Sequence, residues 1–138
     1  YHYNIVQQKS PFKTTAYFVR KPLDVKQMNL ASQYLLGKQD FTSFSKANTQ
    51  TFTNNCNVML ASWQWQDGEL VFAIKADRFL RNMVRAIVGT LLEVGIGKIK
   101  AVQVKEIIDQ NDRCMAGTSV PANALFLSEI EYPKDIFI

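Results

Sequence analysis

The stretch that most constrains the fold runs from Asp77 to Gly95, because its apolar residues recur with the spacing of a helix that buries one face. Asp77 stands where an N-cap carboxylate would accept from the first free N–H groups, and Gly95 stands where a C′ residue would take a positive φ. The sequence therefore predicts one helix across residues 77–95. Its buried face would carry Phe79, Leu80, Met83, Val84, Ile87, Val88, Leu91 and Leu92.

Three arginines and a glycine give this predicted helix its chemical character. Arg78, Arg81 and Arg85 follow spacings of three and four, so they are expected to lie along one line beside the apolar face. Gly89 follows one turn later, although a glycine inside a helix costs about 1 kcal/mol relative to alanine. Two interpretations stay open: a solvated basic edge with a glycine that admits a packed neighbour, or a surface that binds a ligand.

The charge of the chain is concentrated in the same region. The 138 residues include sixteen basic and twelve acidic side chains, a net charge of +4. Six of the basic residues and only two of the acidic ones lie between Lys75 and Lys100, so the rest of the chain is balanced. A basic patch suits a polyanionic partner, although so small an excess is also common in proteins without one.

The composition is that of a soluble globular protein, with 47% hydrophobic and 20% charged residues. Cys56 and Cys114 fit no metal-ligand pattern and are expected to be free thiols in a reducing compartment. Neither a secretory signal nor an apolar run of about 18 residues is found, so the expected location is the cytoplasm and no membrane partner is expected. Because the chain opens at Tyr1 inside a strand-like pattern, we expect it to be part of a longer protein.

The remaining patterns predict an α+β fold, in which an antiparallel or mixed sheet carries helices packed on one face. Asp67-Gly68 between two alternating runs is a strong hairpin signal, and Asp24 is a predicted N-cap for a helix that ends at Gly37. The first hairpin strand is expected to turn Met59, Ala61, Trp63 and Trp65 to one side, and the second Leu70, Phe72 and Ile74. The other expected elements are strands at 1–7, 14–20 and 125–132, a turn at 40–46 anchored by two phenylalanines, a loop or polar strand entry at 47–55 and a helix at 102–110.

Most catalytic patterns are missing. His2 is the only histidine, no glycine-rich phosphate loop follows a strand, and no cluster of histidine, cysteine and aspartate has metal-ligand spacing. The residues by themselves therefore indicate a basic α+β domain that bears aromatic side chains, which suits the binding of a polyanion.

Several motifs nevertheless match one family. The stretch from Arg78 to Gly95 resembles the signature helix of the TruA family of tRNA pseudouridine synthases. Further similarities occur in the family's order and span nearly all of the chain. They are Tyr1-His2-Tyr3 (the opening of a strand shared by the family's two halves), Asp40-Phe41-Thr42-Ser43-Phe44 (a turn), Asp112-Arg113 with Ala116-Gly117 (a loop), and Pro121-Ala122 with Leu125-Phe126-Leu127 (a closing strand).

The resemblance implies part of an enzyme that isomerises uridine to pseudouridine in the anticodon stem-loop of tRNA, without a cofactor or a metal. It places the catalytic aspartate in an Arg-Thr-Asp motif of the N-terminal half, and no Arg-Thr-Asp occurs in this chain. Residues 1–138 are therefore expected to form a single domain, the C-terminal half of a two-half enzyme, and to be inactive alone. The resemblance also implies a homodimer of the full-length protein.

The resemblance assigns two residues to the reaction. Arg85 matches the family arginine that pairs with the catalytic aspartate and fills the space left by the flipped base, which makes it the candidate catalytic residue. A guanidinium suits both tasks because it is planar, always charged and able to hold a carboxylate bidentately. Tyr1 matches the family tyrosine that stacks against the target base, and such a stack contributes about 1–3 kcal/mol.

Four further residues are candidate substrate contacts. Leu125 stands where the family offers an apolar wall to the pocket, with a place in the strand core as the alternative. Lys46, Arg78 and Arg81 are expected to contact phosphates, which would set affinity and salt dependence without reading sequence. Two other functions stay open: a stand-alone RNA-binding module without catalysis, and an assembly domain whose apolar surfaces serve dimerisation.

Overall fold

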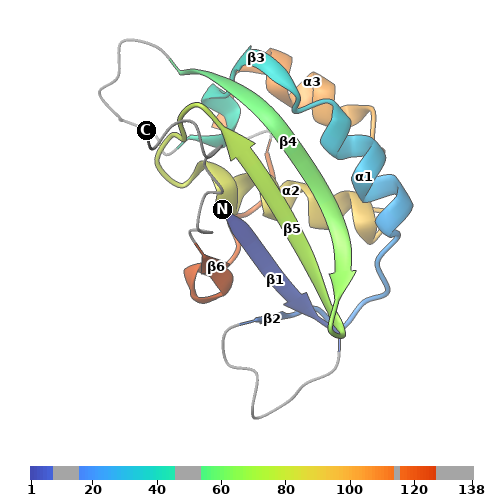
Figure 1. Cartoon of the computed structure of the whole chain (residues 1–138). Coiled ribbons are helices and arrows are strands. Elements are labelled where there is room, and N and C mark those ends of the chain that lie inside the picture. The colour runs from blue at the N-terminus through green and yellow to red at the C-terminus, as the bar shows by residue number, and fades with distance from the viewer. Residues whose placement is uncertain (8–15, 46–53, 114–115, 127–138) are drawn as a thin grey trace, which may run out of the picture.

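The computed structural model describes residues 1–7, 16–45, 54–113 and 116–126. They form a mixed, six-stranded sheet with the α-helices on one side, which confirms the predicted α+β class (Figure 1). The strands are β1 (His2–Val6), β2 (Tyr17–Phe18), β3 (Gly37–Asp40), β4 (Asn55–Gln66), β5 (Glu69–Ala76) and β6 (Leu125–Phe126). The helices are α1 (Val25–Gln33), α2 (Met83–Gly95) and α3 (Gln103–Gln110), with short 3₁₀ turns η1 (Thr42–Phe44) and η3 (Ala122–Ala124).

The strand order is β2-β1-β5-β4-β3, and β6 pairs with β1. β1 runs antiparallel to β5 and β6 and parallel to β2. β6 pairs with the first residues of β1, His2 and Tyr3, whereas β2 pairs with its last two, Ile5 and Val6. The start of β1 is therefore enclosed between β5 and β6, and this is the end of the sheet where the cleft described below lies.

The central hairpin of the sheet forms where Asp67-Gly68 predicted it. Both turn residues have positive φ, 50° at Asp67 and 79° at Gly68, as a type I′ turn requires. The second strand, β5, has the predicted bounds, whereas the first is longer than predicted, because β4 begins at Asn55 and pairs with β3 before it reaches β5. As predicted, the inner face of β5 buries Leu70, Phe72 and Ile74.

The prediction for the inner face of β4 was right at Ala61 and Trp63, each 2% exposed, and wrong at Met59 and Trp65, which are 51% and 53% exposed. A β-bulge explains Met59. Val58 pairs with Ala76 and Leu60 pairs with Lys75, so Met59 is an extra residue that shifts the alternation by one. Val58 therefore takes the inner position, and Met59 turns to solvent.

Helix α1 begins at the predicted cap. The Oδ1 atom of Asp24 accepts from the backbone N–H of Gln27 at 3.1 Å, and the N–H of Asp24 donates to the carbonyl of Gly95 at 2.9 Å, which ties α1 to the end of α2. The helix ends at Gln33 and does not continue to Gly37. Gly37, with φ of 95°, instead opens β3, an edge strand that was not predicted from the sequence.

The predicted start of the central helix was wrong. The carboxylate of Asp77 accepts from the N–H of Asn57 at 2.8 Å and the N–H of Asp77 donates to the carbonyl of Asn57 at 3.1 Å, so Asp77 extends the strand pairing and does not cap a helix. Helix α2 begins at Met83, after Asn82 in a left-handed conformation with φ of 67°. Arg78 and Arg81 therefore precede the helix, and the predicted line of three arginines along it does not form.

The end of α2 also differs from the prediction. Gly95 is the last helical residue, and Gly97, with φ of 83°, occupies the C′ position. Gly95 has a packing role instead, because a Cβ there would lie 2.6 Å from the sulfur of Met28 on α1. The helix is nevertheless central to the core, as predicted. Its buried side chains include Met83, Val84, Ile87, Val88 and Leu91.

Several other local predictions are confirmed, but of the strand predicted at 14–20 only Tyr17–Phe18 is a strand among the described residues, and the segment predicted at 47–55 gives way to β4 at Asn55. Phe41 and Phe44 at η1 are fully buried, and α3 turns Val104, Ile107 and Ile108 inward. Cys56 is a buried free cysteine whose thiol pKa is raised by burial, whereas Cys114 lies outside the described residues. Among the helices described here, none combines the length and apolar character needed to cross a membrane.

Candidate active site

A cleft of about 550 Å³ lies at the N-terminal end of α2 and brings together four of the residues singled out in the sequence. Tyr1, Arg81, Arg85 and Leu125 all line it, although they come from the residue before β1, the approach to α2, the first turn of α2 and the start of β6. Arg78 is not among the lining residues, and Lys46 lies outside the described residues. The other lining residues are Phe79, Leu80, Asn82, Met83 and Val84.

Tyr1 is anchored by its backbone and by a ring contact. Its carbonyl accepts from the N–H of Ile74 at 3.0 Å and its nitrogen donates to the carbonyl of Ile74 at 3.1 Å, so it continues the pairing of β1 with β5. The ring of Tyr1 packs edge-on against Phe79, with centroids 5.1 Å apart and an interplanar angle of 87°. The ring is half-buried, which leaves part of it facing the cleft.

Arg85 is held at one edge of its guanidinium group. Its Nε–H donates to the carbonyl oxygen of Val120 at 2.7 Å, and the N–H of Val120 donates to the carbonyl of Arg85 at 3.2 Å. Within the described part of the chain, no hydrogen bond engages Nη1 or Nη2. Since those two nitrogens carry the remaining N–H groups, Arg85 offers them end-on as a fork.

Val120 belongs to a segment, residues 116–121, that runs along α2 and that we call the strap. The N–H of Gly117 donates to the hydroxyl of Thr90 at 2.8 Å, and that hydroxyl in turn donates to the carbonyl of Ala86 at 2.9 Å. A Cβ on Gly89 would collide with the carbonyl oxygen of Thr118, well inside van der Waals contact. Of the two interpretations of Gly89, the packed neighbour is therefore the right one.

The far end of the strap is fixed by a buried phenol. The hydroxyl of Tyr3 donates to the carbonyl of Pro121 at 2.7 Å. Burial raises the pKa of Tyr3 well above its usual range; nearby Tyr17 raises it further, and the positive charge of Arg85 acts in the opposite direction. Tyr3 is therefore a neutral hydrogen-bond donor at physiological pH, and Arg85 lies close enough for its charge to act on the phenol.

Two residues of this site were not recognised from the sequence as site residues. Phe79 was assigned to the buried face of a helix, whereas it lies before the helix and packs on Tyr1. Asn82 lines the cleft, and its amide donates to the hydroxyl of Ser119 on the strap at 2.6 Å. One signal was available: asparagine tolerates the left-handed conformation and is common beside helix starts, and Asn82 directly precedes the first buried turn of α2.

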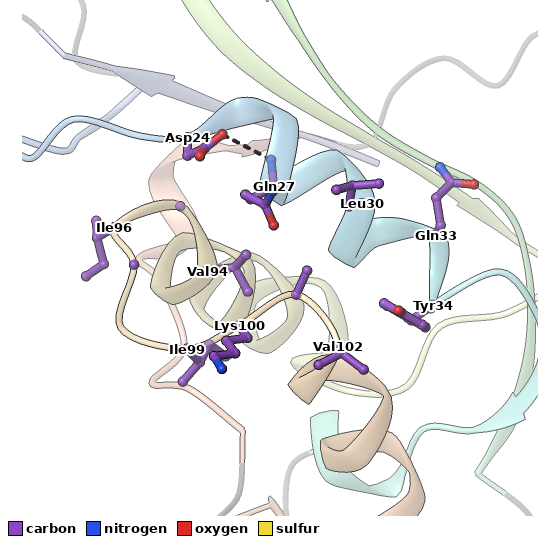
Figure 2. Close-up of a pocket in the computed structure, with 13 residues that line it drawn as sticks. Asp24, Gln27, Leu30, Gln33, Tyr34, Val94, Ile96, Ile99, Lys100 and Val102 are labelled. Carbon is purple, nitrogen blue, oxygen red and sulfur yellow. Dashed lines mark hydrogen bonds between the residues drawn. The ribbon is translucent and has the colours of Figure 1, made fainter.

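A second hollow, of about 800 Å³, lies between α1 and the connection from α2 to α3 (Figure 2). None of the predicted site residues lines it. Its charged side chains are Asp24, which caps α1, and Lys100. Apolar side chains such as Leu30, Val94, Ile99 and Val102 make up most of the rest (Figure 2). It is larger than the Arg85 cleft, but it brings together no set of reactive groups.

Among the described residues, no group of three or more histidine, cysteine, aspartate or glutamate side chains could hold a metal ion. The chemistry that the Arg85 cleft offers is instead that of a cationic fork beside an aromatic ring and an apolar wall, formed by Arg85, Tyr1 and Leu125. Such a cleft can hold a carboxylate at the fork and a flat, uncharged ring against the tyrosine.

Comparison with known proteins points to one family. A family model described as tRNA pseudouridine synthase matches residues 31–133. The chain is 53% identical to the tRNA pseudouridine synthase A of Bacteroides fragilis, with 99% of this chain and 55% of that protein aligned. It is 52% identical to the protein of the same name from Bacteroides thetaiotaomicron, over 99% of this chain and 52% of that protein.

A relative from Porphyromonas gingivalis, also named tRNA pseudouridine synthase A, is 48% identical over 100% of this chain and 56% of its own length. The chain thus spans about half the length of these curated relatives. The family match covers most of the residues of the chain, and the motifs on which the resemblance was based include the segments that form the cleft. The chain belongs to the tRNA pseudouridine synthase family.

Proposed function

We propose that this chain is the C-terminal half of a cytoplasmic enzyme that isomerises uridine to pseudouridine in the anticodon stem-loop of tRNA. The observation that carries the proposal is the convergence of the Arg85 fork and the Tyr1 ring in one cleft. The catalytic aspartate would come from the N-terminal half, where the family resemblance places it, since no Arg-Thr-Asp motif occurs in this chain. We further propose that the full-length protein is a homodimer.

Arg85 would act as the partner of that aspartate. Because its Nε–H is already bonded to Val120, the carboxylate would be held end-on by Nη1 and Nη2. A nearby positive charge favours the ionised carboxylate and lowers its pKa. Taking a uridine out of a base-paired stem costs a few kcal/mol, and a planar cation that occupies the vacated space offsets part of that cost.

Tyr1 and Leu125 would hold the target base. The exposed part of the Tyr1 ring would stack on the uracil, while Phe79 fixes the ring from its buried side. Leu125, half-buried where β6 begins, would give the base an apolar wall. Neither the stack on Tyr1 nor the contact with Leu125 would distinguish one uridine of the tRNA from another. The choice among uridines would therefore depend on the shape of the tRNA.

The remaining basic residues would contact the tRNA backbone. Arg81 is exposed at the rim of the cleft, and Arg78 lies nearby in the chain but outside the cleft lining. We propose phosphate contacts for both, and for Lys46, which lies outside the described residues. Contacts of this kind fix the orientation of the tRNA and make binding weaken as salt is added.

The function is tested with the full-length protein that carries this chain. Incubated with tRNA labelled with tritium at carbon 5 of uridine, it should release tritium to water, because that hydrogen is displaced when carbon 5 bonds to the ribose. Residues 1–138 alone should release none. If the full-length protein binds tRNA tightly but releases no tritium, the stand-alone RNA-binding function is favoured over the enzyme.

Replacing Tyr1 by alanine in that protein should lower kcat/KM for tritium release about fivefold to 150-fold, because a base–aromatic stack contributes about 1–3 kcal/mol. Tyr1→Phe keeps the ring and should retain most of the activity. Tyr34→Ala is the matched control: this half-buried tyrosine borders the other hollow, next to α1, and its loss should leave kcat/KM unchanged. Wild-type kcat/KM in Tyr1→Ala would remove Tyr1 from the site.

A further inference from the structure

We propose that Asn82, Ser119 and Arg113 form a clamp that positions Arg85. The hydroxyl oxygen of Ser119 accepts two hydrogen bonds, from the amide of Asn82 at 2.6 Å and from Nη2 of Arg113 at 2.9 Å. Nη1 of Arg113 donates to the carbonyl of Gly117 at 3.0 Å, so the same guanidinium bonds to the strap at two residues, Gly117 and Ser119. The catalytic consequence of the clamp rests on the function proposed above; its effect on the geometry of Arg85 does not.

The clamp acts on Arg85 through the neighbouring residue of the strap. Ser119 directly precedes Val120, whose carbonyl receives the Nε–H of Arg85 and whose N–H donates to the Arg85 carbonyl. The two ends of the strap are held separately, by Thr90 at Gly117 and by Tyr3 at Pro121. Between these two ends, the clamp fixes the strap at Ser119, which is next to Val120, the residue that bonds to the Arg85 guanidinium.

Arg85 needs a fixed hydrogen-bond partner because its side chain is long and would otherwise rotate freely. An unrestrained arginine side chain has a large rotamer entropy, and a misplacement of about 1 Å in a catalytic group can cost about a hundredfold in rate. The Val120 carbonyl removes rotation at the Nε end and directs Nη1 and Nη2 end-on. Any loosening of the strap at Ser119 would therefore be transmitted to the fork.

The backbone of Asn82 allows its side chain to be tested separately. Asn82 has φ of 67°, a conformation that glycine adopts without strain, so Asn82→Gly removes the amide donor and keeps the turn into α2. Asn111 offers a matched control, since it is exposed at the end of α3 with φ of 52°, and Asn111→Gly makes the same chemical change in the same backbone conformation.

The first readout is the exchange of the Arg85 Nε–H with solvent, followed by ¹H–¹⁵N NMR and assigned by the loss of its signal in Arg85→Lys. Asn82→Gly and Ser119→Ala should each speed this exchange about tenfold, because the bond to Val120 opens more often, whereas Asn111→Gly should not. A clamp that served only the stability of the fold would leave the Arg85 Nε–H exchange unchanged relative to other protected groups. Unchanged exchange in both clamp variants overturns the proposal.

The second readout is tritium release by the full-length protein. Asn82→Gly should lower kcat about tenfold with an unchanged KM for tRNA. The double variant should be no worse than Ser119→Ala alone, because Ser119→Ala already removes the bond to Asn82. If Asn82→Gly fails to fold, Ser119→Ala and Arg113→Lys carry the test. If the clamp variants exchange faster but the wild-type full-length protein releases no tritium, the proposed function is refuted and the effect of the clamp on Arg85 stands. Wild-type kcat together with faster exchange would refute the positioning role.

Discussion

Replacing Arg85 by lysine in the full-length protein should lower kcat for tritium release about a hundredfold or more and leave the fold intact. Lysine keeps the charge, but it has no Nε–H for the Val120 carbonyl and cannot form a planar fork. Disrupting one partner of a buried, hydrogen-bonded charge pair typically costs about 2–5 kcal/mol. Single-turnover tritium release measures the effect on the chemical step, and circular dichroism checks that the variant is folded.

Arg81→Lys is the matched control for this prediction. Arg81 lies on the same cleft but is exposed, and its proposed contact is with phosphate, which a lysine can also make. Its kcat should stay within about twofold of wild type, because a phosphate contact positions the tRNA and does not act on the base. Equal tritium release by the wild type and by Arg85→Lys would exclude Arg85 from the mechanism.

Gly89→Ala should lower the free energy of unfolding by about 2 kcal/mol, even though alanine favours a helix interior over glycine by about 1 kcal/mol. The added Cβ meets the carbonyl oxygen of Thr118, a backbone atom that cannot rotate away because the strap is bonded on both sides of it, at Gly117 and at Val120. For a chain of this size the midpoint of thermal unfolding should fall by about 5–8 °C. Denaturant titration of the wild type and the variant measures the difference.

Gly95→Ala separates this collision from the general effect of alanine in α2. The substitution lies in the same helix, but its Cβ would meet the Met28 thioether at 2.6 Å, and a flexible side chain can move aside. We expect a loss below about 1 kcal/mol for this control. A Gly89→Ala protein as stable as the wild type would mean that the strap does not rest on α2 in solution.

The parts of the fold that were predictable from the sequence are those with local causes. Asp67-Gly68 demands positive φ at adjacent positions, and Asp24 reaches the N–H of a residue three positions ahead, so neither depends on the rest of the chain. The inward residues of α3 follow from spacing alone. Of the candidate site, Arg85, Tyr1 and Leu125 were named through family resemblance and Arg81 as a basic residue expected to contact phosphate, and the structure brings these four to one cleft.

The parts that could not be predicted depend on partners distant in sequence. Asp77 looked like a helix cap because its competing partner, Asn57 on the neighbouring strand, is identifiable only once the pairing of β4 and β5 is known. The bulge at Met59 has no sequence signature of its own. The strap bonds Arg85 to Val120 across 35 positions, so no local pattern reveals that the candidate catalytic side chain is held by a carbonyl from a loop.

The position of Tyr1 has a consequence for how the site arises during folding. Its bonds to Ile74 span 73 positions, and Tyr3, two residues further on and turned to the same side, reaches Pro121 across 118. Closing such long loops costs entropy before any contact compensates for it. The hairpin at Asp67 and helix α1 can form early from neighbouring residues, whereas a chain that has not yet brought its first strand into register lacks the Tyr1 and Leu125 sides of the cleft.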